Sequence, residues 1–398
     1  MTKATIDDID VAGRRVLLRV DFNVPLRDGH IGDDRRIRAA LPTIASLRHR
    51  GARTVIVTHV GRPGGHVDPT LSVAPIAARL SELLGAQVGI ATDVVGSSAQ
   101  AVVEGLRDGE VGMLENVRFE PGEEANDPQL ADTLAGFAEV FVNDAFGTAH
   151  RAHASTEGVA HRLPAVAGYL MARELEMLGS VLENPCHPLV SVLGGAKVST
   201  KLGVITNLVK RVDTLHIGGA MACTFYRAQG EQTGRSLVEE DQVEVARGVL
   251  DAARTAGCTL QLPVDVVVAE EAVEGAATQA VGWDAIPEDR MVVDVGPATV
   301  AAITATFADA GTVVWNGPLG IYEIDAFARA TREVAVALAD SPALSIIGGG
   351  DLGAAVEDAG VVDKIDFIST GGGATLELLE GRVLPGVAAL RDRQPVAG

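Results

Sequence analysis

Residues 345–360, SIIGGGDLGAAVEDAG, join a short apolar run to a helical pattern through a glycine-rich turn. Gly348, Gly350 and Gly353 match G-x-G-x-x-G, a pattern in which glycines let a tight turn and a helix start approach a phosphate. A short apolar segment that ends in glycine and opens a helix is typical of one strand–helix unit of a parallel sheet. The stretch therefore predicts an α/β fold with a ligand near this turn.

The same alternation of strand and helix patterns continues along the whole chain. In the first half, helices are predicted at 37–50, where Pro42 is expected to kink or restart the helix, and at 72–85. Buried strands are predicted at 15–22, 54–60, 87–92, 140–146, 189–194, 214–219, 259–269, 312–317, 344–350 and 364–370. Because these strands are too many for one sheet, the fold predicted is α/β with two doubly wound parallel-sheet (Rossmann-like) domains. The boundary is placed within 161–178, where a linker enters a long helix.

The composition limits the classes of partner. The chain has 53 acidic against 33 basic residues, a formal net charge of −20, and 47% hydrophobic residues. Nucleic acids and anionic membranes bind basic surfaces, so we expect neither as a partner. An acidic protein binds a small anion only where its basic side chains are gathered locally.

The cysteines, the N-terminal residues and the apolar runs bear on the compartment in which the protein is expected. Cys186, Cys223 and Cys258 lie far apart and form no C-x-x-C pair, so no disulfide framework is predicted. The first ten residues show no apolar segment typical of a signal peptide, and no apolar run reaches the roughly 18 residues of a membrane span. We expect a cytoplasmic protein.

Unusual residues gather where the predicted strands end, and in doubly wound folds ligands bind beyond the carboxyl ends of the strands. The segments at these ends are DFN (21–23), HVGRPGG (59–65), ENVRF (115–119), NDAFGTAHR (143–151), GGAK (194–197), WNGPLG (315–320), GGGD (348–351) and STGGG (369–373).

The glycine pattern alone would also suit an NAD-dependent oxidoreductase. That hypothesis requires an acidic residue at the end of the next strand, where it would hold the ribose hydroxyls. The next strand, 364–370, is followed instead by a second run of glycines, 371–373. Two glycine-rich corners on neighbouring strands favour a backbone cradle for phosphates of another kind.

Three charged side chains lie close to these corners. Asp351 at the cradle would repel a bare phosphate, so it is either a ligand of a divalent cation such as Mg²⁺ or a helix N-cap. Lys197 and Lys201 are four residues apart, one helical turn, so both are either surface lysines or cations that face one phosphate ligand. The Walker A pattern and the protein-kinase motifs do not occur.

The first half of the chain holds the local cluster of basic residues. Strand-end segments supply Arg36, His59, Arg62, Arg118 and Arg151, and the arginine fork suits phosphate and carboxylate groups. Together they favour a small polyanion. Asp21 and Asn23 add polar groups for a hydroxyl, and His150 and His153 are interpreted as structural or phosphate-edge residues rather than metal ligands.

These segments together resemble the phosphoglycerate kinase family, nearly end to end and in family order. The segments are RVDFNVPL (19–26), RIRAALPTI (36–44), HVGRPGG (59–65), LENVRFEPGEE (114–124), VNDAFGTAHRAHAST (142–156), LGGAKVSTKLGVI (193–205), VVWNGPLGIYE (313–323), IIGGGD (346–351) and ISTGGGATLELLEG (368–381). The resemblance implies Mg²⁺-dependent, reversible phosphoryl transfer from 1,3-bisphosphoglycerate to ADP, giving 3-phosphoglycerate and ATP. It also implies a monomer with two domains, a cleft between them and a hinge.

The resemblance implies a role for each domain and for named residues. Residues 1–168, with 384–398 returning to them, would bind phosphoglycerate, and 169–383 would bind the nucleotide. Substrate contacts would be Asp21, Phe22, Asn23, Arg36, His59, Val60, Gly61, Arg62, Arg118 and Arg151. Nucleotide contacts would be Lys197, Lys201, Val292, Asn316, Pro318, Glu323, Gly349, Gly350, Asp351 and Leu352, with Asp351 holding Mg²⁺ largely through the nucleotide. Catalytic groups would be Arg36, Lys197, Gly350 and Gly373.

The chain departs from the family pattern at several positions near the nucleotide residues. Leu352 stands where Thr is common, so a hydroxyl that could meet phosphate is missing. The other departures are Thr200, Ala220, Val292 and Tyr322, and none removes a catalytic group that the resemblance implies. The alternatives are a nucleotide-dependent oxidoreductase, which lacks its strand-end acid, and a non-catalytic phosphometabolite- or nucleotide-binding protein of the same fold.

Overall fold

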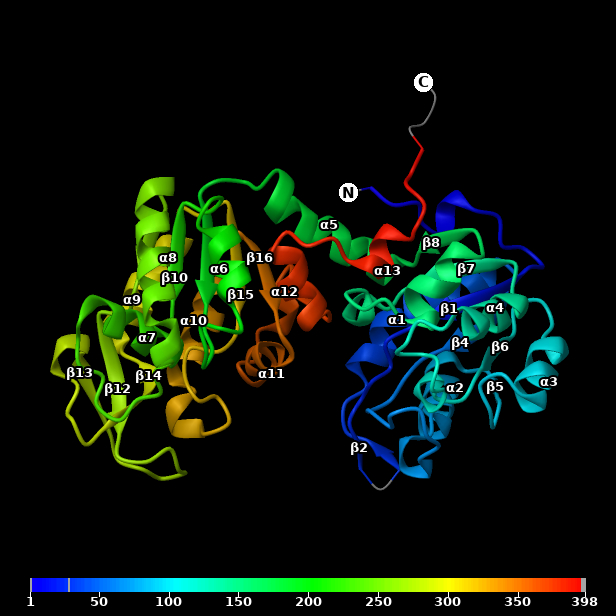
Figure 1. Cartoon of the computed structure of the whole chain (residues 1–398), viewed down its shortest axis with the longest axis horizontal. Coiled ribbons are helices and arrows are strands. Elements are labelled where there is room, and N and C mark those ends of the chain that lie inside the picture. The colour runs from blue at the N-terminus through cyan, green and yellow to red at the C-terminus, as the bar shows by residue number, and fades with distance from the viewer. Residues whose placement is uncertain (1, 28, 395–398) are drawn as a thin grey trace. The chain divides into compact units, whose positions relative to one another are not determined.

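The structure is a computed structural model that describes residues 2–27 and 29–394. The chain divides into two compact units, Met1–Glu176 with Val383–Gly398, and Met177–Arg382 (Figure 1). The predicted boundary after residue 168 stands just before helix α5 (Tyr169–Glu183), and the unit changes within that helix. The ligand of each unit stays a prediction.

The first unit is built on a parallel six-stranded sheet of order β5-β6-β4-β1-β7-β8. Its strands, with a small β2–β3 hairpin, are β1 (Arg15–Arg19), β2 (Leu26–Arg27), β3 (His30–Ile31), β4 (Arg53–Val57), β5 (Val88–Ile90), β6 (Val111–Met113), β7 (Val140–Asn143) and β8 (Ala165–Ala167). Its helices, with the start of α5, are α1 (Arg35–His49), α2 (Ala74–Leu84), α3 (Ser97–Gly105), α4 (Pro128–Gly136) and α13 (Pro385–Ala388). The connections run from β1 toward one edge and return to β7 on the other side, so the sheet is doubly wound with its reversal between β1 and β7.

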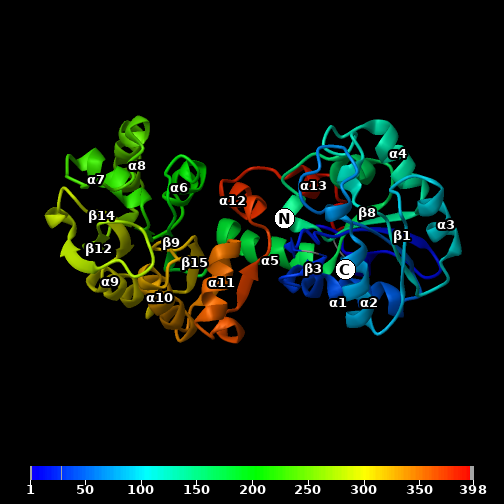
Figure 2. The ribbon, with the colours of Figure 1, turned by 90° about the horizontal axis from the view of Figure 1, so that it is seen from below.

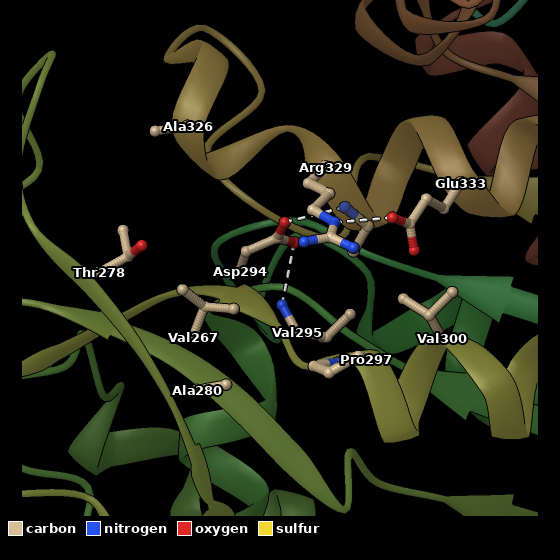
Figure 3. Close-up of a pocket in the computed structure, with 11 residues that line it drawn as sticks. Val267, Thr278, Ala280, Asp294, Val295, Pro297, Val300, Ala326, Arg329 and Glu333 are labelled. Atoms are coloured by element: carbon tan, nitrogen blue, oxygen red, sulfur yellow. Dashed lines mark hydrogen bonds and ion pairs between the residues drawn. The ribbon is translucent and has the colours of Figure 1, made fainter.

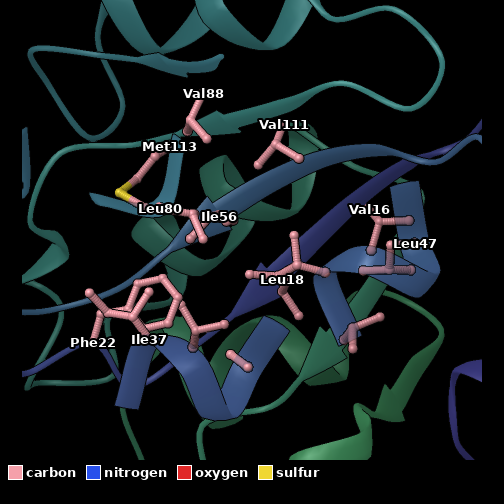
Figure 4. Packing of buried hydrophobic residues seen from close by; sticks show 14 of the residues in the cluster. Val16, Leu18, Phe22, Ile37, Leu47, Ile56, Leu80, Val88, Val111 and Met113 are labelled. Atoms are coloured by element: carbon pink, nitrogen blue, oxygen red, sulfur yellow. The ribbon is translucent and has the colours of Figure 1, made fainter. Parts of the chain in front are cut away.

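Burial on both faces explains why the strands of this sheet are apolar throughout. Val16 and Leu18 of β1 pack with Ile56 of β4 in the core cluster that includes Ile37 and Leu47 of α1 (Figure 4). Leu17, which points to the opposite face, is equally buried. Alternate residues therefore meet helices on opposite faces, as a parallel sheet requires.

The second unit has its own parallel sheet, of order β11-β10-β9-β15-β16-β17, which is the Rossmann order when these strands are numbered along the chain. Its strands are β9 (Leu189–Leu193), β10 (Thr214–Ile217), β11 (Thr259–Gln261), β15 (Thr312–Asn316), β16 (Leu344–Gly348) and β17 (Phe367–Ser369). The helices are α6 (Leu202–Leu208), α7 (Met221–Gln229), α8 (Val243–Ala256), α9 (Pro297–Phe307), α10 (Arg329–Ala339), α11 (Gly350–Asp358) and α12 (Gly373–Leu379). The turned view shows the helices of each unit around its sheet (Figure 2).

A separate antiparallel sheet of order β13-β12-β14 belongs to the second unit and was not predicted. Its strands are β12 (Asp265–Ala269), β13 (Thr278–Gly282) and β14 (Met291–Val295). The predicted single strand at 259–269 is wrong, because the chain leaves the parallel sheet after β11 and starts β12 in this second sheet. Pro263, between the two, has no backbone N–H for a continuous ladder.

The predicted fold class of two doubly wound parallel-sheet domains is confirmed. Of the two alternatives for Pro42, the restart is wrong, because α1 is one helix with Pro42 inside it. Among the helices of residues 2–27 and 29–394, none combines the length and the apolar content that a membrane crossing needs.

Candidate active site

The strand ends of the first unit lie side by side. Arg19, the last residue of β1, pairs with Val57 at the end of β4 and with Asn143 at the end of β7. The polar residues that follow these strands therefore leave the sheet at one edge, which is its carboxyl edge.

The segment after β1 is bonded to its neighbours at this edge. Arg36, in the first turn of α1, contacts Asp21 with 2.8 Å between Nη1 and Oδ2. The backbone N–H of Gly61 donates to Asn23 Oδ1 at 3.0 Å. Asp21, Asn23, Arg36 and Gly61, all predicted to contact the substrate, are thus brought together.

Arg19 is a buried cation that the sequence-based prediction did not include. Its side chain is 1% exposed, and it donates from Nε to Ser155 Oγ at 2.8 Å and from Nη1 to the carbonyl oxygen of Val20. Burial lowers its pKa, while the Glu123 and Asp21 carboxylates raise it. The signal was present as an arginine at the end of the apolar run RVLLRV, but the run was interpreted only as a strand.

His59 is a neutral imidazole at this edge. Burial lowers its pKa well below the usual value, and the nearby Arg19, Arg118 and Arg36 cations lower it further. Its Nδ1 lies 3.3 Å from Arg19 Nη2, which can only donate, so Nδ1 is the acceptor and the ring hydrogen is on Nε2. Nε2–H is therefore the group that His59 can offer as a donor.

Glu123 is linked to Arg19 through Ser155, whose hydroxyl accepts from Arg19 and donates to Glu123. It is fully buried and accepts from the hydroxyl of Ser155 at 2.6 Å and from the Ser155 backbone N–H at 2.9 Å. His153 Nδ1 lies 3.7 Å from Glu123 Oε1, and burial together with the Arg118 and Arg19 cations lowers the pKa of His153 to about 4. Sequence reasoning placed His153 at the edge but missed Glu123 and Ser155.

We call Arg19, Arg36, His59, Arg118, Arg151 and His153 the basic cluster. Burial lowers the pKa of Arg118, Glu124 raises it, and the Arg19 and Arg151 cations lower it again. Arg19 and Arg151 are thus close enough to Arg118 to disfavour its positive charge, although the whole protein is acidic. A bound anion would relieve that repulsion.

Three further residues were predicted to contact the substrate, namely Phe22, Val60 and Arg62. Phe22 and Val60 have buried side chains, so only their backbones can reach a ligand. Those backbones are already engaged, with Phe22 N–H donating to Thr58 Oγ1 and Val60 N–H to Asn116 Oδ1. Arg62 is exposed on the loop after β4.

In the second unit, four strands end in the same row. Asn316 at the end of β15 pairs with Leu193 on β9 and with Gly348 on β16, and Gly348 pairs with Ser369 on β17. The glycine-rich segments that follow these strands are therefore neighbours along one carboxyl edge.

Glycine is required in the turns that follow β9 and β10, close to the point where the winding direction of the sheet reverses. A Cβ on Gly194 would lie 2.0 Å from the carbonyl oxygen of Pro318, and one on Gly219 would lie 2.4 Å from that of Gly195. Because the backbones themselves are in contact, no side chain fits between these loops. A ligand at these turns would therefore meet backbone atoms rather than side chains.

Lys201 lies behind this edge. It is buried, and its Nζ donates to the side-chain oxygen of Asn316 at 2.6 Å and to the Asn316 backbone carbonyl at 2.9 Å. Burial lowers its pKa to about 8, and the Asp351 carboxylate raises it in part. The prediction that one helical turn joins Lys197 and Lys201 is wrong, since α6 begins only at Leu202 and Lys197 is exposed.

A cavity of about 350 Å³ opens at this edge, and we call it the glycine pocket. Four residues predicted to bind the nucleotide line it: Val292, Pro318, Glu323 and Asp351. Its other lining residues, which were not predicted as contacts, are Gly195, Ala196, Gly219, Ala220, Val293, Asp294, Leu319, Gly320 and Ile321. The pocket thus combines bare backbone, apolar walls and carboxylates.

Helices α11 and α12 both start at glycines that follow the neighbouring strands β16 and β17, and the free N–H groups of a helix start favour an anion. Gly349, with φ 108°, caps α11, and Gly350 is its first residue, while Gly373 is the first residue of α12 after Gly372, with φ 51°. The helix-cap alternative for Asp351 is wrong, because the cap is Gly349 and Asp351 lies inside the first turn. The Leu352 side chain is fully buried, so it can meet a ligand only through its backbone.

Comparison with known proteins decides the family. The family model described as "Phosphoglycerate kinase" matches residues 6–382. The chain belongs to the phosphoglycerate kinase family. It is similar to the phosphoglycerate kinases of Pelotomaculum thermopropionicum (54% identity, covering 99% of this chain and 100% of the relative) and Roseiflexus sp. (54% identity, 98% and 100%). The solved phosphoglycerate kinase of Coxiella burnetii is 42% identical, with a TM-score of 0.89 over 97% of this chain and 98% of that one.

Family membership identifies the activity class. A phosphoglycerate kinase is a phosphotransferase with a carboxyl group as acceptor, and it uses ATP or ADP. The oxidoreductase alternative is thereby excluded, and the glycine pattern at 348–353 belongs to a kinase.

Proposed function

We propose that the basic cluster binds 3-phosphoglycerate or 1,3-bisphosphoglycerate and that the glycine pocket binds ADP or ATP. The observation that carries this proposal is the basic cluster itself: in a chain of net charge −20, its arginines meet at one sheet edge. Asp21, Asn23 and neutral His59 would bind the substrate's hydroxyl and carboxylate edges, and Arg62 would join from its exposed loop. Glu323, Lys201 and Asn316 would hold the nucleotide.

The proposed transfer needs no general base. In the ATP-consuming direction the nucleophile is the carboxylate of 3-phosphoglycerate, which is already ionised near pH 7. The chain has to align that oxygen with the γ-phosphorus and neutralise charge on the phosphoryl oxygens. We assign this role to Arg36, Lys197 and the backbone N–H groups of Gly350 and Gly373.

We further propose that Mg²⁺ accompanies the nucleotide. Within residues 2–27 and 29–394, no three His, Cys, Asp or Glu side chains meet as a metal site would require. Asp351 is an exposed carboxylate on the wall of the glycine pocket, and Mg²⁺ typically takes one or two carboxylates with phosphate oxygens. The donor set therefore fits an ion that arrives with the nucleotide. The ion would neutralise phosphate charge.

Transfer also requires the two ligands to meet. The proposed phosphoglycerate residues lie in one unit and the nucleotide residues in the other. We propose that the units close for transfer, which would also exclude water from the hydrolysable acyl phosphate. Wild-type transfer activity in a variant cross-linked so that the units stay apart would contradict closure.

A coupled assay tests the proposed function. It contains the protein, 3-phosphoglycerate, ATP and Mg²⁺, with excess glyceraldehyde-3-phosphate dehydrogenase and NADH. We expect NADH consumption that requires ATP and Mg²⁺ and that falls by about 100-fold or more in Lys197→Ala. The matched control is Lys210→Ala, an exposed lysine of the same unit, which should retain full activity.

The outcomes separate the alternatives. Binding of 3-phosphoglycerate and ATP without NADH consumption would favour a non-catalytic binding protein. Full activity in Lys197→Ala would remove Lys197 from the proposed mechanism. We also propose a cytoplasmic monomer, and a sedimentation mass of twice 41.2 kDa would contradict the monomer.

A further inference from the structure

Asp294 is a buried carboxylate for which the proposed mechanism has no role. It lies near the end of β14, is 2% exposed, and lines two cavities at once. One is the glycine pocket. The other is a separate cavity of about 260 Å³ with Val267, Ala280, Pro297 and Arg329 on its walls (Figure 3). Asp294 is thus part of the partition between them.

Both oxygens of Asp294 accept hydrogen bonds from backbone groups. Oδ1 accepts from the N–H of Val295 at 2.9 Å, and Oδ2 accepts from the N–H of Ala330, in the first turn of α10, at 3.0 Å (Figure 3). The ionised carboxylate therefore ties the start of α10 to the end of β14.

The segment Leu319–Ile321, part of the glycine-pocket wall, rests directly on this junction. A Cβ on Gly320 would lie only 2.4 Å from Asp294 Oδ1, so the backbone of Gly320 packs on the carboxylate. The N–H of Leu319 donates to Thr331 Oγ1 of α10 at 3.0 Å, and the N–H of Ile321 donates to the Val293 carbonyl of β14 at 3.0 Å. Any shift between β14 and α10 would therefore move this wall.

The charges around Asp294 come from few elements. On α10, Glu333 and Arg329 face it, and they also pair with each other at 2.6 Å between Oε1 and Nε. The residues that β12, β13 and α9 contribute to the second cavity are not titratable: Val267, Thr278, Ala280, Pro297 and Val300. On the side of the glycine pocket the titratable groups are Glu323 and Asp351.

We propose that Asp294 is a positioning residue for the nucleotide: its ionised carboxylate holds Leu319–Ile321 in the shape that binds ADP, and its protonation weakens that binding. The inference rests on the proposed function, because it takes the glycine pocket as the nucleotide site. Protonation turns one carboxylate oxygen into a hydroxyl, a weaker acceptor, so one of the two backbone N–H groups loses its strong partner.

The charge state of Asp294 changes in an accessible pH range. Burial raises the pKa of Asp294 to about 7, Glu333 raises it further, and the backbone donors and Arg329 lower it. The carboxylate is ionised above that pH and neutral below it, so ADP affinity should fall as the pH is lowered from 8 to 6.

The first experiment measures the dissociation constant of ADP for the full chain by calorimetry from pH 6 to 8, in wild type and Asp294→Asn. Asparagine offers one acceptor oxygen, so it should resemble the protonated state at every pH. We expect roughly five-fold weaker ADP binding at pH 8 and no difference from wild type near pH 6. ADP itself titrates in this range, and only the difference between the two proteins is interpreted.

Three outcomes decide the proposal. A folded Asp294→Asn that binds ADP like wild type at pH 8 overturns the positioning role alone. Loss of 3-phosphoglycerate affinity in the same variant also overturns it, because it would indicate general damage. A wild-type protein that binds no ADP overturns the proposed nucleotide site and this inference together.

Two further variants test the proposal even if Asp294→Asn fails to fold. Glu333→Gln removes the charge that raises the Asp294 pKa, and Arg329→Gln removes the charge that lowers it. Neither side chain lines the glycine pocket. We expect the midpoint of the ADP-affinity change to move to lower pH in the first variant and to higher pH in the second. Unmoved midpoints, or shifts in the same direction, overturn the proposal.

Discussion

Lys201 couples a buried charge to the proposed nucleotide site, and its titration predicts a loss of affinity at alkaline pH. With its pKa lowered to about 8, the ammonium is charged below that pH and neutral above it. Since the charged form favours phosphate, ADP binding should weaken by about ten-fold as the pH rises from 7 to 9. Calorimetry with ADP over this range checks the prediction. Lys201→Met should be weak throughout and lose the alkaline change, whereas Lys210→Met should retain it.

The burial of Arg19 predicts that its replacement lowers the free energy of unfolding of the first unit. Burial raises the pKa of Glu123 and the Arg19 cation lowers it, so Arg19→Met would remove a buried charge that favours the ionised Glu123 carboxylate. Removing such a charge partner costs roughly 3–5 kcal/mol in the free energy of unfolding. Urea unfolding followed by circular dichroism measures this loss. The matched control is the exposed Arg62→Met, for which we expect a change of at most about 0.5 kcal/mol. Equal losses in both variants would remove Arg19 from its structural role.

Sequence patterns located polar residues that follow a strand better than charged residues within one. Asp21, His59 and Asp351 follow strands and lie at the carboxyl edge of a sheet, as predicted, while their contacts with ligands stay predictions. Arg19 and Asp294 were not predicted. Each lies within an apolar strand, and the pattern of apolar residues does not show whether a charged residue in a strand is buried with partners. Glu123 was missed because its partner Ser155 is 32 residues away.

At the scale of elements, the contact between the turns after β9 and β15 predicts intolerance of a single methyl group. Gly194→Ala would place a Cβ 2.0 Å from the carbonyl oxygen of Pro318, so the two backbones must separate. We expect a loss of roughly 1–3 kcal/mol in unfolding free energy and at least about ten-fold weaker ADP binding. Thermal unfolding and calorimetry measure the two effects.

Gly248→Ala is the control for that prediction. Gly248 lies inside α8, and no atom stands within 4 Å of its added Cβ. Because alanine favours a helix over glycine, this variant should gain roughly 0.8 kcal/mol in unfolding free energy and bind ADP normally. A Gly194→Ala variant that behaves like Gly248→Ala would contradict the close packing of the two turns.

The sequence did not predict for every strand whether it pairs parallel or antiparallel. The runs at 312–317 and 344–350 were correctly predicted as parallel strands, because each is followed by a glycine corner and a helix. The run at 259–269 contains an equally apolar half, yet β12 pairs antiparallel with both β13 and β14. Buried parallel and antiparallel strands have the same side-chain periodicity and similar hydrophobicity. Only the strands with which a strand pairs therefore decide its direction in the sheet.

For the whole molecule, the C-terminal segment predicts a stability effect confined to the first unit. Leu384, Val387 and Leu390 are buried, Gly386 accepts from Asn143 Nδ2 at 3.2 Å, and the N–H of Ala4 donates to the Arg391 carbonyl at 2.9 Å. Truncation after Arg382 removes three buried apolar side chains and should cost the first unit roughly 5 kcal/mol. Urea unfolding followed by circular dichroism should show an early transition.

Tryptophan fluorescence is the internal control for the truncation. Both tryptophans, Trp283 and Trp315, belong to the second unit. Their unfolding midpoint should therefore move much less than the early transition seen by circular dichroism. A fluorescence midpoint that moves equally far would mean that the two units unfold as one.

The sequence by itself determined the α/β class, the two doubly wound sheets and the sheet edges at which the proposed ligand residues gather. Each is encoded in local order, as an apolar run, a glycine or polar corner and a helix. The sequence also carried the family, through motifs nearly end to end. Only the tertiary structure decided which groups share an environment. The neutrality of His59, the burial of Lys201 against Asn316 and the position of Asp294 between two cavities all depend on residues distant in the chain, since burial and charge act through space rather than along the sequence.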